Sequence, residues 1–135
     1  MDYTSMKWNK ENYKEFIGEL KEMQDKQYRE FHNKIIGAEV EVIGLRSPVV
    51  KDIAKKIAKG DWEGFLAQKK GKYYEETTLR GQVIGFAKTD KEIIKEYIEK
   101  YKEVHDKAII SIYITGNIWR IGISGIRQSS WFRYP

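Results

Sequence analysis

The sequence predicts an all-α fold of stacked helix pairs, and three observations support this. Apolar residues recur at helical spacing in six segments between residues 9 and 104. Short polar or glycine-containing turns separate these segments, so neighbouring helices are expected to run antiparallel and to bury their apolar stripes by stacking. The 135 residues contain only two prolines and no cysteine, which disfavours a turn-rich β-sandwich and excludes disulfides and thiol catalysis.

The first two helices are predicted over residues 9–23 and after Asp25. Asp25 is the expected N-cap of the second helix, and Gly37 is expected to end it. Residues 40–45 alternate weakly between apolar and polar, a pattern that can be mistaken for a strand. The two apolar stripes comprise Tyr13, Phe16, Ile17, Leu20 and Met23, and then Tyr28, Phe31, Ile35 and Ile36.

The start of the third helix carries the strongest local signal. Ser47 is expected at the N-cap and Pro48 at the first helical position, with Gly60 as the C-terminal stop. Asp61 is the expected N-cap of a short fourth helix that contains Phe65.

The last two helices are predicted on either side of residue 89. A basic turn at residues 69–72 precedes a helix over residues 73–88. Thr89 and Glu92 match a capping box, which opens the most regular amphipathic helix of the chain. Its apolar stripe comprises Ile93, Ile94, Tyr97, Ile98, Tyr101 and Val104.

The composition changes after Lys107, so the chain divides into a helical domain, residues 1–107, and a divergent tail, residues 108–135. The tail lacks Lys, Asp and Glu and holds four of the six serines and two of the four tryptophans. Its apolar start, residues 109–114, favours a strand or a buried extended piece, and three glycines follow. We expect a frameshifted or truncated origin for this tail, which the nucleotide sequence of the gene tests.

Charge gives little indication of a partner. The net charge is +5, but residues 1–107 hold 22 basic and 20 acidic side chains, so the main body is a mixed-charge surface. No apolar run approaches the roughly 20 residues that cross a bilayer, and no secretory signal is visible, so we expect a cytoplasmic protein without a membrane contact.

A series of motifs resembles the bacterial DNA alkylation repair family, the AlkD-like alkylpurine DNA glycosylases, over about residues 10–105. The series runs from Asp25-Lys26-Gln27-Tyr28-Arg29-Glu30-Phe31 and Lys34-Ile35-Ile36 to Ile43-Gly44-Leu45-Arg46-Ser47-Pro48, Ile53-Ala54-Lys55 and Tyr73-Tyr74-Glu75-Glu76 with Leu79. The resemblance implies an α–α superhelix of HEAT-like repeats with a basic concave face for duplex DNA. It also implies excision of N3- and N7-alkylated purines, with an oriented carboxylate that stabilises the sugar cation.

The sequence departs from the family at that carboxylate. The family's Trp-x-x-x-Asp is absent, because Trp119 is followed by Arg120-Ile121-Gly122-Ile123 and no acid occurs after Asp106. We therefore predict no catalytic residue and a catalytically impaired chain that corresponds to the N-terminal half of a family member. The alternative is a helical-repeat scaffold without chemistry that binds DNA or protein. We also expect self-association through the C-terminal end of the superhelix, whose apolar face the next repeat would cover.

The candidate DNA-binding residues are basic or aromatic and lie on the second and third helices. Lys51, Lys55 and Lys59 repeat every four residues and could contact phosphates or form an ordinary solvated helix face. Arg46 lies at the start of that helix. Tyr28 could reach DNA or pack in the core. Glu75 and Glu76 are better explained by the helix dipole than by acid–base catalysis. His32 and His105 are too isolated to form a metal site, and no cofactor is predicted. The candidate set is therefore Tyr28, Arg46, Lys51, Lys55 and Lys59.

Overall fold

The computed structural model describes residues 2–36 and 41–104, which form six α-helices and no strand. The predicted all-α class is confirmed for this part of the chain, whereas Gly37 and the tail of residues 108–135 lie outside it. One isolated parallel bridge joins Glu41 to Tyr73. The helices are α1 (Lys10–Glu22), α2 (Lys26–Ile36), α3 (Ser47–Ala58), α4 (Trp62–Ala67), α5 (Tyr74–Phe86) and α6 (Lys91–Val104).

Three helices begin at side-chain caps, of which Asp25 and Asp61 were predicted and Asn9 was not. Asn9 and Asn12 bond each other's backbone amides at 2.9 and 2.8 Å at the start of α1. The Asp25 carboxylate accepts from the Tyr28 amide at 3.0 Å, and Asp61 accepts from the Gly64 amide at 3.1 Å. Each side chain satisfies an amide that the helix itself leaves without a partner.

The starts of α3 and α6 each differ by one residue from the prediction. Arg46, not Ser47, is the N-cap of α3, and it makes no side-chain capping bond. Its carbonyl accepts the first helical bond, from Val50, at 3.2 Å. In α6 the carbonyl of Asp90 accepts from Ile94 at 3.1 Å, so the helix starts one residue later than a cap at Thr89 predicts.

Gly60 follows α3 as predicted, but for a different reason. Its φ is not positive, so it is not a left-handed helix stop. A Cβ at this position would lie 2.6 Å from the carbonyl oxygen of Thr4, so the N-terminal segment could not approach. Asp61 also accepts from the Trp8 amide at 3.1 Å. These two residues therefore tie the N-terminal segment to the start of α4.

Large aromatic rings fill the core between α1 and α4. Phe16 and Phe65 are fully buried, and their ring centroids lie 5.8 Å apart, edge to face. Trp8 lies 5.1 Å from both rings. Burying one phenylalanine side chain contributes about 1.5–3 kcal/mol. α3 adds an aliphatic stripe to this cluster, consisting of Val50, Ile53, Ala54 and Ile57.

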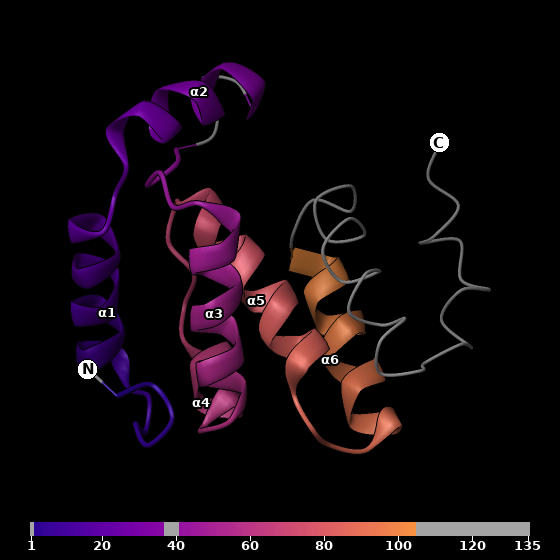
Figure 1. The fold of residues 1–135 in the computed structure, drawn as a ribbon. Helices are drawn as coiled ribbons and strands as arrows, with labels where there is room; N and C mark the ends of the chain where they lie inside the picture. The colour runs from indigo at the N-terminus through magenta and orange to yellow at the C-terminus, as the bar shows by residue number, and fades with distance from the viewer. Residues whose placement is uncertain (1, 37–40, 105–135) are drawn as a thin grey trace, which may run out of the picture.

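The helices are arranged as a row with α2 across one end. In Figure 1, α1 lies at one side and α6 at the other, with α3 and α5 between them. The segment after α4 returns the chain to the end where α3 begins, so α5 runs in the same direction as α3, and α6 runs antiparallel to α5. The parallel bridge between Glu41 and Tyr73 fits this course, because each residue shortly precedes one of the two parallel helices.

The predicted apolar face of α2 is not part of the core. α2 crosses the end of the row instead of lying along α1 (Figure 1). Phe31 is 60% exposed and Tyr28 is half-buried, so the prediction that Phe31 packs inward is wrong. The side chains of Ile35 and Ile36 lie outside the described set. Among the described residues, every helix is too short or too polar to cross a bilayer.

Candidate nucleic-acid interface

Two of the candidate lysines, Lys51 and Lys55, lie on α3, and Lys59 is the C-cap residue that follows its last turn. Lys51, Lys55 and Lys59 are exposed, and the buried stripe of Val50, Ile53, Ala54 and Ile57 holds the helix on the core. Lys59 comes eight positions after Lys51, at the end of the helix, which at helical rise is about 12 Å, the axial rise of three to four base pairs. Their exposure fits both interpretations of these lysines, a phosphate-contacting face and an ordinary solvated face.

The ammonium groups of these lysines have no ionic partner among the described residues. Lys55 Nζ lies 5.5 Å from the centroid of the Phe86 ring, a cation–π contact that leaves its charge uncompensated. The neighbouring Lys56 differs, because it pairs with Asp52 at 3.1 Å one turn earlier on the helix. Lys51, Lys55 and Lys59 therefore keep their charge available to an external anion, and Lys56 does not.

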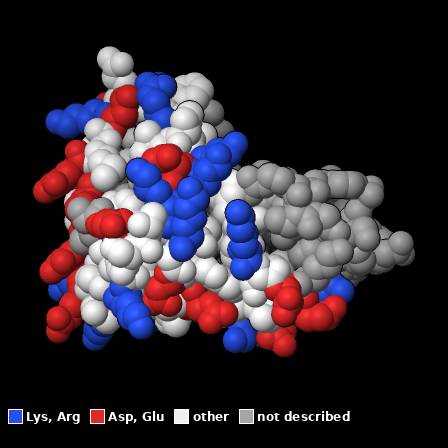
Figure 2. Space-filling view, turned by 60° about the horizontal axis from the view of Figure 1, so that its bottom comes forward, with Lys and Arg blue, Asp and Glu red and all other residues white. Residues whose placement is uncertain are grey.

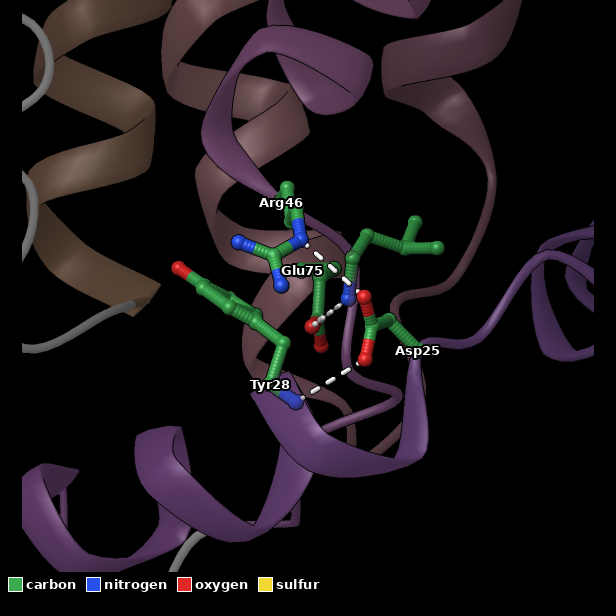
Figure 3. A network of polar contacts seen from close by, with 5 residues as sticks. Asp25, Tyr28, Arg46 and Glu75 are labelled. Atoms are coloured by element: carbon green, nitrogen blue, oxygen red, sulfur yellow. Dashed lines mark hydrogen bonds and ion pairs between the residues drawn. The ribbon is translucent and has the colours of Figure 1, made fainter.

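Arg46 and Tyr28 are in direct contact. The Arg46 guanidinium lies 5.1 Å from the centroid of the Tyr28 ring, and its Nε donates to Asp25 at 3.0 Å. Figure 3 shows the guanidinium between the ring and the carboxylate. The Tyr28 amide, and then the Arg46 side chain, hold the pKa of Asp25 below its ordinary value. Among the residues that the structure describes, no hydrogen bond, ion pair or ring contact joins this pair to the three candidate lysines.

Glu75 and Glu76 occupy the first turn of α5, as the dipole interpretation requires, but both are only 1% exposed. Glu75 accepts from the amides of Ile43, Gly44 and Leu45 at 2.8, 2.9 and 3.2 Å. A buried carboxylate needs such donors, because desolvation without them is expensive. Glu75 thus holds the segment that leads into α3 in place, a role that the sequence alone did not predict.

Glu76 belongs to a second buried network. It accepts from the Tyr13 hydroxyl at 2.5 Å and from the Gly71 amide at 2.7 Å. Arg80, 2% exposed, donates to that hydroxyl at 2.9 Å and to the Gln68 carbonyl at 2.8 Å. Burial is the main cause that raises the pKa of the Tyr13 phenol. This network holds α1 and α5 together and offers no group to a ligand.

The remaining polar candidates form no site within the described chain. His32 packs edge-on against Tyr74, with ring centroids 5.0 Å apart, and no group of three or more metal-ligating side chains gathers among the described residues. Lys72 pairs with Glu41 at 3.1 Å, which raises the lysine's pKa, whereas burial lowers the pKa of Lys70. His105, Asp106, Trp119 and Trp131 lie outside the described residues.

The surface charge is mixed, in agreement with the near balance of residues 1–107. Figure 2 shows several basic side chains gathered in the middle of one face, with acidic side chains among and around them and along the lower edge of the view. Repulsion by nearby acids limits any long-range attraction of a polyanion. Binding of such a ligand therefore depends on short-range contacts with specific basic residues.

Comparison with protein-family models, curated proteins and solved structures finds no match to this chain.

Proposed function

We propose that this chain binds duplex DNA through the α3 face, as a DNA alkylation repair protein of the helical-repeat type that its motifs resemble. The observation that carries the proposal is the row of three exposed lysines, one helical turn apart and without a described ionic partner. In this proposal the row of α1, α3, α5 and α6 is the start of a HEAT-like superhelix. The second part of the proposed DNA interface is Arg46, which lies against Tyr28 at the start of α3.

The charges favour phosphate contacts without base recognition. Lysine is a flexible point charge, suited to phosphates and poorly suited to reading base edges. Three such contacts give a slope of about −2.7 in log K against log[salt], or about a 40-fold loss of affinity from 50 to 200 mM salt.

The proposed binding is not accompanied by excision in this chain. A glycosylase of this type needs an accessible carboxylate near the sugar of the damaged nucleotide. No acid follows Asp106 in the sequence, and the two buried carboxylates, Glu75 and Glu76, each accept three hydrogen bonds from internal donors. DNA binding is therefore the activity we assign to the chain.

Fluorescence anisotropy with a labelled duplex tests the interface. We expect Lys51→Gln, Lys55→Gln and Lys59→Gln together to lower the salt slope by about 2.7, and Lys7→Gln, Lys10→Gln and Lys14→Gln to change it far less. The control set removes the same charge from an exposed stretch of the N-terminal segment and α1. Equal effects of the two triple variants would refute the α3 interface. A wild-type chain that does not bind the duplex would favour the protein-binding scaffold.

A glycosylase assay tests the lack of chemistry. With a duplex that contains N7-methylguanine, we expect release of the base at the spontaneous rate. Robust excision by the purified chain would show that another group supplies the missing carboxylate.

A further inference from the structure

The carboxylate of Glu75 fixes the segment that immediately precedes Arg46. Its two oxygens accept three consecutive amides, from Ile43, Gly44 and Leu45. Leaving any of these buried donors without an acceptor would cost about 1–3 kcal/mol, so the segment has little freedom while the Glu75 side chain accepts these three bonds. The direction in which the chain enters Arg46 is set by a residue of α5.

The same segment also fixes the acid that binds Arg46. The Gly44 carbonyl accepts from the Asp25 amide at 2.9 Å, and Gly44 has a φ of 99°, which side-chain-bearing residues rarely adopt. Asp25 in turn binds Arg46 Nε at 3.0 Å. Glu75 therefore acts on both ends of the ion pair, on Arg46 through Leu45 and on Asp25 through Gly44. Figure 3 shows Glu75 close to the Asp25–Arg46 pair.

These contacts leave one edge of Arg46 open. Its Nε edge is taken by Asp25 and its plane lies over the Tyr28 ring, while no described residue bonds its two Nη groups. The side chain is 58% exposed. A guanidinium held in this way loses less entropy when its Nη pair binds the oxygens of one phosphate.

We propose that Glu75 is a positioning residue for Arg46: it locks residues 43–45 so that Asp25 and Tyr28 hold the guanidinium with its Nη edge presented to a backbone phosphate. The phosphate part rests on the proposed DNA binding. The positioning part concerns this chain alone and can be measured without DNA.

The Arg46 Nε–H resonance in a ¹⁵N spectrum of the full chain provides the DNA-free readout. A hydrogen bond to Asp25 slows exchange of this proton with water. We expect Glu75→Gln to abolish the protection, because the amide presents an NH₂ group to backbone donors. Asp25→Asn should also abolish it, since the charged acceptor is lost. Glu11→Gln, an exposed first-turn glutamate of α1, is the matched control and should leave it unchanged.

Duplex affinity provides the second readout. We expect Glu75→Gln and Arg46→Gln each to weaken binding about fivefold and to lower the salt slope by about one, as the loss of one phosphate contact does. The double variant should bind like either single variant, because both remove the same contact. Independent, multiplying losses would overturn the positioning role.

Two outcomes separate the proposals from each other. A wild-type chain that does not bind DNA, with the Nε–H signature behaving as expected, refutes the proposed function and supports the positioning. Protection of Arg46 Nε–H that survives Glu75→Gln refutes the positioning, whatever the DNA affinity. If Glu75→Gln does not fold, Glu75→Asp replaces it, which keeps a carboxylate on a shorter side chain. The protection of Arg46 Nε–H should be lost in that variant too, and its survival would refute the positioning.

Discussion

Arg80→Met tests how much the buried network between α1 and α5 contributes to stability. The substitution keeps an unbranched apolar stem but removes the guanidinium and its three hydrogen bonds, to the Tyr13 hydroxyl at 2.9 Å, the Gln68 carbonyl at 2.8 Å and the Glu76 carbonyl at 3.4 Å. It also leaves the Glu76 carboxylate without a nearby buried cation. Hydrogen bonds to charged groups contribute about 1.5–3 kcal/mol each, and breaking a buried ionic network costs about 3–5 kcal/mol.

Urea unfolding followed by circular dichroism measures this loss. With a denaturant slope of about 2 kcal/mol per molar, the midpoint should fall by about 2 M. Arg80→Lys should recover only part of the loss, because one ammonium cannot replace a fork that spans two acceptors. Lys14→Met, an exposed position on α1, is the control for charge removal. A midpoint for Arg80→Met that matches this control would refute the reasoning.

Three further predictions concern single positions. Burial raises the pKa of the Tyr13 phenol, so above pH of about 10 the unfolded chain releases this proton while the folded chain keeps it. The free energy of unfolding should then fall as pH rises, by up to about 1.4 kcal/mol per unit, and urea midpoints for Tyr13→Phe should show a shallower fall. Gly44→Ala should lower the free energy of unfolding by about 2 kcal/mol, because φ at this position is 99° and the new Cβ would lie 2.6 Å from Arg29 Cβ. Gly18→Ala has open space around it and should raise the free energy of unfolding by about 0.5–1 kcal/mol. Thermal melts measure both changes. Phe31→Ser should change the unfolding free energy by less than about 0.5 kcal/mol, and a larger loss would mean that α2 packs more tightly than its exposure indicates.

Local signals predict the helices of this chain well, because capping is a local event. Asn9, Asp25 and Asp61 each bond an amide three residues ahead, so a short stretch of sequence contains both partners. The prediction that Ser47 caps α3 is wrong because Arg46 accepts the first helical bond through its backbone carbonyl. Every residue has such a carbonyl, so the residue type gives no signal. Phe31 misleads because periodicity identifies an apolar face but does not say whether another element covers it.

From the sequence alone, only those residues of the candidate site could be identified whose role depends on exposure to solvent. The spacing of Lys51, Lys55 and Lys59 places them on one face, and the structure confirms their exposure. The roles of Glu75 and Arg80 depend on partners that lie far away in the sequence, such as the Tyr13 hydroxyl, 67 residues from Arg80. One signal could have found them: the charges of α5 stand among threonines, glycines and apolar residues, a composition typical of a helix buried on all sides.

The six-residue helix α4 has a consequence for the order of folding. A helix this short does not persist alone in water, so it forms only when its neighbours are already assembled. Those neighbours come from both ends of the described chain: Trp8 meets Phe65 at 5.1 Å, and Tyr97 meets Trp62 at 5.2 Å. Closing such long loops is slow compared with helix formation. In stopped-flow refolding, α4 should therefore be among the last elements to form. Trp8, which packs against Phe65, and Trp62, the first residue of α4, should report that step by their fluorescence.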